Sequence, residues 1–162
     1  MAKTDYESRP YRACVGIVLM NRAGEVFAGR RVDHPEGHWQ MPQGGIDEGE
    51  TPRDAAFREL LEETGTDRAE YLAEMEEWIH YDLPPEIADK IWKGRYRGQK
   101  QRWFCLRFTG SDTDIDIVTE HPEFTAWRWM DLQDTVREVI PFKRDIYRRV
   151  ADAFAHLAQP EN

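Results

Sequence analysis

The sequence predicts an α/β fold in which a mixed β-sheet lies between helices, an α/β/α sandwich. Short apolar runs of strand length alternate with two helical segments, an order typical of a sheet covered by helices. The 162 residues suffice for one domain with a substantial core. No apolar run approaches the ~20 residues of a membrane helix, so no membrane association is expected. We expect one domain over residues 11–158, with flexible ends at residues 1–10 and 159–162.

The first half of the chain predicts three strands. Residues 13–20 and 25–30 are apolar runs joined by the turn sequence Asn21-Arg22-Ala23-Gly24, so they should form a hairpin. Residues 38–41 predict a short strand that leads into a glycine-rich loop. Glycine in that loop allows unusual dihedral angles and close approach of a ligand to the backbone.

Residues 52–64 predict a helix with defined ends. Thr51 is a good N-cap, Pro52 takes the first helical position, and Asp54 favours the positive helix end. Gly65 is typical of the residue that stops a helix.

The second half of the chain alternates extended and helical segments. Residues 71–81 should be mostly extended and end at Leu83-Pro84-Pro85. Residues 99–108 and 125–130 predict two further strands. Residues 143–157 predict a terminal helix with an apolar stripe, formed by Ile146, Val150, Phe154 and Leu157.

The helix over residues 52–64 carries Glu59, Glu62 and Glu63 on one side, within an arc of about 100°. Like charges at this spacing oppose helix formation, and a divalent cation bound by carboxylate oxygens would compensate them. The alternative is an ordinary solvated acidic face. The side chains expected to point the other way are those of Ala56, Phe57, Leu60, Leu61 and Thr64.

Charge is unevenly distributed along the chain. The net charge of −9 alone argues against nucleic acid. However, residues 47–77 contain twelve acidic and three basic side chains, whereas residues 90–107 contain seven basic and no acidic ones. The separation suits a polyphosphate carried with a metal ion. Basic side chains spread over a solvated surface remain the alternative.

Residues 44–66 fit the pattern G-x5-E-x7-R-E-U-x-E-E-x-G-U, where U is a bulky aliphatic residue, except that Thr66 takes the last position. The pattern resembles the Nudix box of the Nudix hydrolases. Its members here are Gly44, Glu50, Arg58, Glu59, Leu60, Glu62, Glu63 and Gly65. Arg58 can pair with a loop carboxylate, and Glu50 can orient a metal ligand or its water. With Gly44 and Gly65, these two are expected to be structural.

The resemblance extends outside the box and covers about residues 11–155. The run Gln99-Lys100-Gln101-Arg102-Trp103-Phe104 is its most discriminating part, with Trp39 to Gly45, Pro122 to Phe124 and Phe142 to Arg149. These segments resemble the bacterial RNA pyrophosphohydrolases, kin of the plant-type dinucleoside polyphosphate hydrolases. The resemblance implies a Nudix fold with the box helix against the sheet.

The implied activity is metal-dependent hydrolysis of phosphoanhydride bonds. Pyrophosphate would leave the 5′ end of triphosphorylated RNA, and the 5′-monophosphate left behind would promote mRNA decay. The alternative substrate is a dinucleoside polyphosphate, such as diadenosine tetraphosphate or pentaphosphate. A third hypothesis is a Nudix module that binds nucleotides without catalysis. The three intact box glutamates argue against it, because such a module need not retain them all.

The resemblance also implies site residues. Mg²⁺ or Mn²⁺ would be bound by the catalytic residues Glu59, Glu62, Glu63 and Glu123, and either Glu59, which we favour, or Glu123 could be the general base. Without the resemblance, Glu123 would be an ordinary loop residue. Phosphate contacts are expected from Arg12, Arg30, Arg31, Tyr81, Lys100 and Lys143. One of the adjacent arginines must face away, and Tyr81 could be an exposed strand residue. Ile140 and Phe142 could sandwich the first base.

Other residues are assigned to structure or surroundings. We expect Trp103, Phe104, Trp127 and Trp129 mainly in the core, and His34, His38 and His80 on the surface or in loops. Cys14 and Cys105 lie in apolar runs and suit a reducing cytoplasm. The N-terminal segment has no apolar run typical of a signal peptide. Nothing in the sequence indicates a protein partner.

Overall fold

The fold is taken from a computed structural model, which describes residues 5–33 and 37–160. His34 and parts of both expected flexible ends lie outside these residues. Within them, a sheet of eight strands has the order β3-β2-β1-β7-β5, with β4 on β1, β6 on β7 and β8 on β2. The strands are β1 (Tyr11–Met20), β2 (Val26–Arg31), β3 (Trp39–Gln40), β4 (Gln43–Gly45), β5 (Ala69–Glu74), β6 (Ile79–Asp82), β7 (Gly98–Phe108) and β8 (Phe124–Met130).

The sheet is mixed because its two longest strands run parallel. β1 and β7 pair in parallel from Tyr11↔Gly98 to Met20↔Arg107, while the other pairings are antiparallel. β1 also pairs with β4, so it lies between the loop that precedes the helix and the strand β7.

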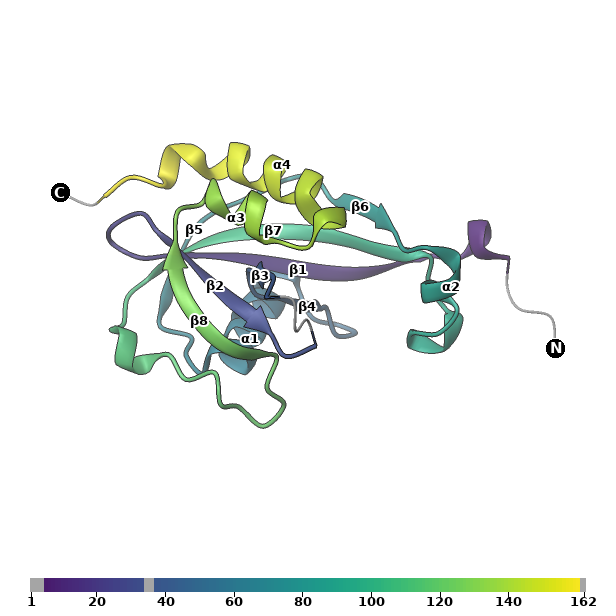
Figure 1. Cartoon of the computed structure of the whole chain (residues 1–162), viewed down its shortest axis with the longest axis horizontal. Helices are drawn as coiled ribbons and strands as arrows, with labels where there is room; N and C mark the ends of the chain where they lie inside the picture. Colours follow the sequence, from purple (N-terminus) through teal and green to yellow (C-terminus); the bar gives the residue numbers. More distant parts are fainter. Residues whose placement is uncertain (1–4, 34–36, 161–162) are drawn as a thin grey trace.

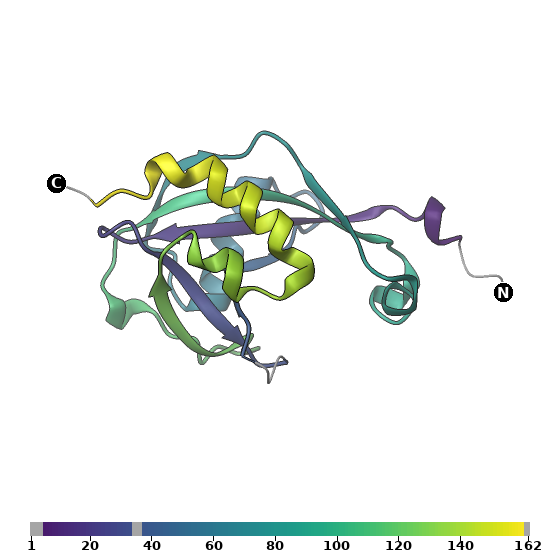
Figure 2. The same cartoon turned by 45° about the horizontal axis from the view of Figure 1, so that its top comes forward.

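Helices cover both faces of the sheet (Figures 1 and 2). α1 (Pro52–Thr64) lies on one face, and α3 (Asp134–Glu138) and α4 (Arg144–Phe154) lie on the other. The short α2 (Pro85–Ala88) lies near the N-terminal ends of β1 and β7. The predicted α/β/α sandwich with a mixed sheet is therefore confirmed.

Strand β7 contributes to two apolar clusters by alternation of its side chains. Trp103 and Cys105 join the cluster on the α4 side, which includes Tyr147 and Val150. Phe104 and Leu106 join the cluster on the α1 side with Leu60, and Trp127 and Trp129 pack half-buried against it. The four expected core aromatic residues thus all contact a core. Cys14 and Cys105 are free and buried.

Most predicted elements are present, with differences at their ends. The bounds of α1 match the prediction, Thr51 Oγ1 accepts a hydrogen bond from Asp54 N at 3.1 Å, and Gly65 adopts φ 77°. The extended segment 71–81 is divided into β5 and β6. The terminal helix is shorter than predicted, because residues 141–143 and 155–157 form 3-10 turns around α4. No helix in the described ranges is long and apolar enough to cross a membrane.

The predicted division of α1 into a glutamate face and an opposite face does not match the burial of Leu61 and Glu63. Its side chain is 46% exposed, whereas Glu63 is only 7% exposed. The core face of the helix runs through Ala56, Leu60 and Glu63, residues three or four apart. Glu63 therefore lies toward the sheet at Gln43, and Leu61 is turned outward.

Gly16 on β1 makes room for the Trp103 side chain. A Cβ atom at Gly16 would overlap the indole of Trp103, which is fully buried. We predict that Gly16→Ala lowers the free energy of unfolding by about 1–3 kcal/mol, as overpacking does. This cost exceeds the ~0.5–1 kcal/mol that alanine gains over glycine inside a strand.

Urea unfolding of Gly16→Ala measures this cost. Gly49→Ala is the comparison, because Gly49 has φ 79° and open space around it, so only a backbone cost of about 1 kcal/mol is expected there. A Gly16→Ala variant as stable as the wild type would contradict the packing described.

Candidate functional site

One cavity is lined by the acidic face of α1, and a second is lined in part by Gln43, which precedes α1. The first has a volume of about 360 Å³ and is lined by Glu59, Leu61, Glu62, Glu63, Thr119, Glu120, His121 and Glu123. It brings together all four glutamates expected at the metal. The second has a volume of about 680 Å³ and combines an apolar wall with basic and amide side chains.

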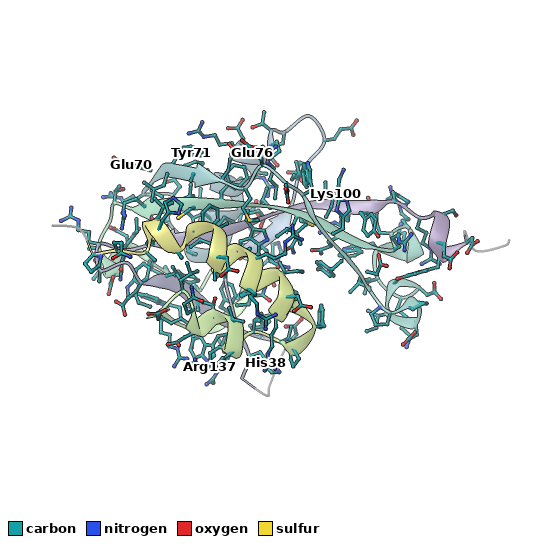
Figure 3. The ribbon with its side chains drawn as sticks, turned by 90° about the horizontal axis from the view of Figure 1, so that it is seen from above. His38, Glu70, Tyr71, Glu76, Lys100 and Arg137 are labelled. Carbon is teal, nitrogen blue, oxygen red and sulfur yellow. The ribbon has the colours of Figure 1, made fainter. Side chains whose placement is uncertain are left out.

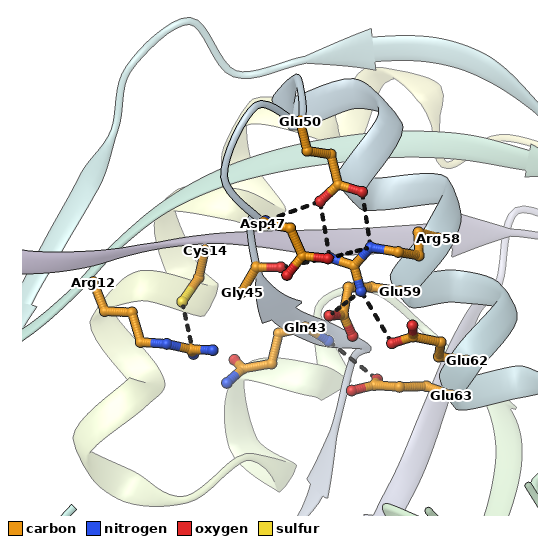
Figure 4. Close-up of polar contacts among 10 residues, drawn as sticks. All are labelled: Arg12, Cys14, Gln43, Gly45, Asp47, Glu50, Arg58, Glu59, Glu62 and Glu63. Atoms are coloured by element: carbon orange, nitrogen blue, oxygen red, sulfur yellow. Dashed lines mark hydrogen bonds and ion pairs between the residues drawn. The ribbon is translucent and has the colours of Figure 1, made fainter. Parts of the chain in front are cut away.

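Arg58 connects the loop to the acidic face of α1 (Figure 4). Its Nε and Nη2 atoms donate to the two carboxylate oxygens of Glu50 at 2.8 and 2.9 Å, and Nη2 also donates to Gly45 O at 2.8 Å. Its Nη1 atom donates to Glu59 at 2.9 Å and to Glu62 at 3.1 Å. The hydrogen bonds from Arg58 to Glu50 lower the pKa of Glu50. One guanidinium therefore braces the loop and compensates two of the glutamates.

The backbone of the loop approaches the carboxylates closely. A Cβ atom at Gly44 would overlap the Glu59 carboxylate, so the carboxylate can keep this position only beside a glycine. Glu63 Oε2 accepts a hydrogen bond from Gln43 N at 3.2 Å. The turn into the helix thus holds both carboxylates against backbone atoms.

The first cavity brings several carboxylates together, and two of them are largely shielded from solvent. Burial, together with the charges of Glu59 and Glu123, raises the pKa of Glu63 well above its usual value. Burial also raises the pKa of Glu59. Thr119 Oγ1 is buried without a hydrogen-bond partner in the described residues. A hard divalent cation prefers oxygen ligands such as these carboxylates and this hydroxyl group.

The carboxylates share a cavity without forming a closed metal site. Among the described residues, no three His, Cys, Asp or Glu side chains are grouped so that they could hold a metal ion. The reason lies partly in Arg58, since Glu59 and Glu62 both direct an oxygen to its Nη1 atom. Metal binding would require these carboxylate oxygens to exchange Arg58 for the cation.

The second cavity collects five of the eight residues expected to contact phosphate or base. They are Arg31, Tyr81, Ile140, Phe142 and Lys143. The rings of Tyr81 and Phe142 lie 6.1 Å apart between centroids, and Phe142 is 55% exposed. An aromatic side chain that is half exposed at the rim of a cavity can stack on a base.

Lys143 is a buried cation at the polar end of this cavity. Its Nζ atom donates to Gln40 Oε1 at 3.3 Å and to Gln43 Oε1 at 3.2 Å. Burial and the nearby charge of Arg31 lower the pKa of Lys143 to about 8. Among the described residues, no carboxylate accepts a hydrogen bond from Lys143, so its charge is suited to an anionic ligand.

Three residues expected at phosphate do not line either cavity. Arg30 is exposed and lies over the Trp39 ring at 5.4 Å, so Arg31 is the inward member of the pair. Lys100 (Figure 3) follows Gln99, which lines the second cavity, so strand alternation turns it to the other face, where it lies over Trp78 at 4.9 Å.

Arg12 is intermediate between these cases. Its guanidinium lies 5.0 Å from the ring centre of Trp92, a residue of the second cavity, and Nη1 donates to Cys14 Sγ at 3.4 Å (Figure 4). Phosphate binding by Arg12, Arg30 and Lys100 stays a prediction.

The sequence analysis missed several lining residues. Thr119, Glu120 and His121 lie in the first cavity, and Gln43 and Gln99 lie in the second. Gln99 had a signal, because Gln99 and Gln101 alternate along a predicted strand and therefore share a face, whereas Gln43 had none. The three residues before Pro122 had none, since they lie in an irregular segment.

Comparison with known proteins supports the resemblance. The model of the NUDIX domain matches residues 10–150. The RNA pyrophosphohydrolase of Roseobacter denitrificans is 59% identical over 91% of this chain and 94% of its own. That of Dinoroseobacter shibae is 55% identical over 96% of this chain and 98% of its own.

Solved structures share the fold at low identity. The Escherichia coli dihydroneopterin triphosphate pyrophosphohydrolase has a TM-score of 0.67 at 21% identity, covering 87% of this chain and 97% of its own. A Caenorhabditis elegans Ap4A hydrolase has a TM-score of 0.62 at 19% identity, covering 88% and 98%. The predicted Nudix box is thus part of a match over most of the sequence, and the chain belongs to the NUDIX domain family.

Proposed function

We propose that this protein is a metal-dependent hydrolase that removes pyrophosphate from the 5′ end of triphosphorylated RNA and leaves a 5′-monophosphate. The observation that carries the proposal is the link that Gln43 forms between a residue of the first cavity and a residue of the second. The Gln43 N–H group donates to Glu63 in the acidic cavity, and its side-chain oxygen accepts from Lys143 in the second cavity. A polyphosphate chain can therefore reach the acidic cavity while its nucleoside occupies the second. The names of relatives 54–59% identical support RNA as the substrate.

The four glutamates of the first cavity would hold the divalent cation, Mg²⁺ or Mn²⁺. A cation there neutralises phosphate oxygens and lowers the pKa of a bound water. Glu59, whose pKa is raised by burial, is the preferred general base, and Glu123 is the second candidate. Arg58 keeps Glu59 and Glu62 within reach of the cavity.

The second cavity orients the substrate. Lys143 and Arg31 would contact phosphate oxygens, and Tyr81, whose pKa burial raises, stays a neutral hydrogen-bond donor. Ile140 and Phe142 would contact the first base, where stacking predicts weak base selectivity. The 5′-monophosphate product would expose a transcript to ribonucleases that prefer such an end, a role in mRNA decay in the cytoplasm.

Substrate preference is the first test. Triphosphorylated RNA and diadenosine tetraphosphate are supplied in parallel with Mg²⁺, and kcat/KM is compared. We expect the larger kcat/KM for RNA, because the basic and apolar parts of the second cavity can engage a nucleotide at a 5′ end. A large preference for the dinucleotide would reassign the protein to dinucleoside polyphosphate hydrolysis.

Removal of single carboxylates is the second test. Glu59→Gln and Glu63→Gln should lower kcat by roughly 10²-fold or more, the size of effect seen when one transition-state contact is lost. Glu70→Gln is the matched control, because Glu70 is exposed on β5 outside both cavities (Figure 3). Circular dichroism should show an intact fold. Unchanged turnover in both site variants would refute the assignment.

The pH dependence of kcat/KM tests Lys143. Because its pKa is lowered to about 8, the side chain loses its charge as the pH rises through about 8. We therefore expect kcat/KM to fall above that pH. Lys143→Arg keeps the charge, so the fall should shift to higher pH in that variant. An alkaline limb that is identical in both proteins would exclude Lys143 as its source.

A further inference from the structure

A chain of hydrogen bonds runs beneath the polar end of the second cavity. It begins at Trp103, whose indole Nε1 donates to Gln101 Oε1 at 3.0 Å. Gln101 Nε2 then donates to Gln99 Oε1 at 3.0 Å and to Gln43 Oε1 at 3.2 Å. Trp103 and Gln101 are fully buried, whereas Gln43 and Gln99 line the cavity.

The direction of this chain follows from the chemistry of the indole. An indole N–H group can only donate, so Gln101 must turn its oxygen to Trp103. The two hydrogens of the Gln101 amide then point to Gln43 and Gln99. Each of those residues must turn its own oxygen inward to accept. One buried donor thus determines the orientation of three amide groups.

The outer glutamines are left with their nitrogen atoms free to donate. Gln43 Oε1 accepts a second hydrogen bond, from Lys143 Nζ at 3.2 Å, which strengthens its orientation. Within the described part of the chain, neither Gln43 Nε2 nor Gln99 Nε2 donates to another residue. Both nitrogen atoms belong to side chains of the cavity wall.

We propose that the Trp103 indole, acting through Gln101, orients Gln43 and Gln99 so that both present amide N–H groups to oxygen acceptors of the substrate. Trp103 and Gln101 are positioning residues, and Gln43 and Gln99 bind. The proposal deepens the proposed function and rests on it for the identity of the substrate.

The orientation matters because an amide is a donor at one end and an acceptor at the other. With the hydrogen bonds as described, the polar end of the second cavity presents hydrogen-bond donors from Arg31, Lys143 and the amides of Gln43 and Gln99. An inverted amide would instead present a carbonyl oxygen to phosphate oxygens, which also only accept. The acceptors could belong to the polyphosphate or to the base.

Two substitutions at Gln101 test the chain without touching the cavity wall. Gln101→Met has similar length and releases both outer amides. Gln101→Glu supplies a carboxylate that accepts from Trp103 and from the outer amides, which would invert them. We expect KM for triphosphorylated RNA to rise about threefold for Met and roughly tenfold for Glu, with kcat changed little.

A background that lacks the outer amides separates orientation from the added charge. In Gln43→Met, Gln99→Met protein, the further change Gln101→Met should have no effect on KM, and Gln101→Glu should retain only its charge effect. An undiminished effect of Gln101→Met in that background would overturn the proposal. Should the Gln101 variants fail to fold, Gln99→Met and Gln43→Met alone test the same donors at the cavity wall.

Inorganic tripolyphosphate, titrated calorimetrically, identifies the acceptor and does not depend on turnover. If the Gln101 variants lose affinity for both tripolyphosphate and RNA, the amides contact phosphate. If they lose affinity for RNA alone, the amides contact the base. Unchanged affinity for both would overturn the proposal. A wild-type protein that binds tripolyphosphate but does not hydrolyse triphosphorylated RNA would contradict the proposed function and leave the amide chain to be tested by binding.

Discussion

The site depends on the position of β1 between β4 and β7. Gly16 pairs with Gln43 on one side and with Trp103 on the other, and Cys14 pairs with Gly45 and Gln101. Because Gly16 has no side chain, the Trp103 indole can lie across β1. Side chains from two strands that are not neighbours therefore meet above the middle one. This arrangement joins the loop of the acidic cavity to the amides of the second cavity.

Charge compensation explains how the acidic face of α1 persists. Three glutamates at close spacing oppose a helix, but Arg58 binds two of them and also holds Glu50 and the loop carbonyl. The third glutamate, Glu63, is buried against the backbone of Gln43 instead. The sequence left open the alternative of an ordinary solvated acidic face. That alternative describes only Glu62, because Glu62 alone of the three glutamates is exposed.

Features with local causes were predicted correctly, and features with non-local causes were not. The ends of α1 were predicted correctly because caps and glycine stops act within a few residues. Leu61 was misplaced because the buried arc of a helix depends on what the helix packs against. Lys100 is turned away from the cavities although its neighbours Gln99 and Gln101 are involved, and a strand prediction states alternation without stating which face is inside.

The fold class, the box helix with its caps and the four glutamates of the acidic cavity were all predicted before the fold was known. Those features follow from short-range periodicity, from capping, and from a spacing pattern that resembles one family. The folded protein was needed to establish that Arg31 faces inward rather than Arg30 and that Lys143 is buried beside Gln43. It was also needed to establish that Trp103 orients a set of glutamines. These results depend on residues brought together by the β4-β1-β7 pairing, and contacts across strands distant in sequence leave no local pattern to read.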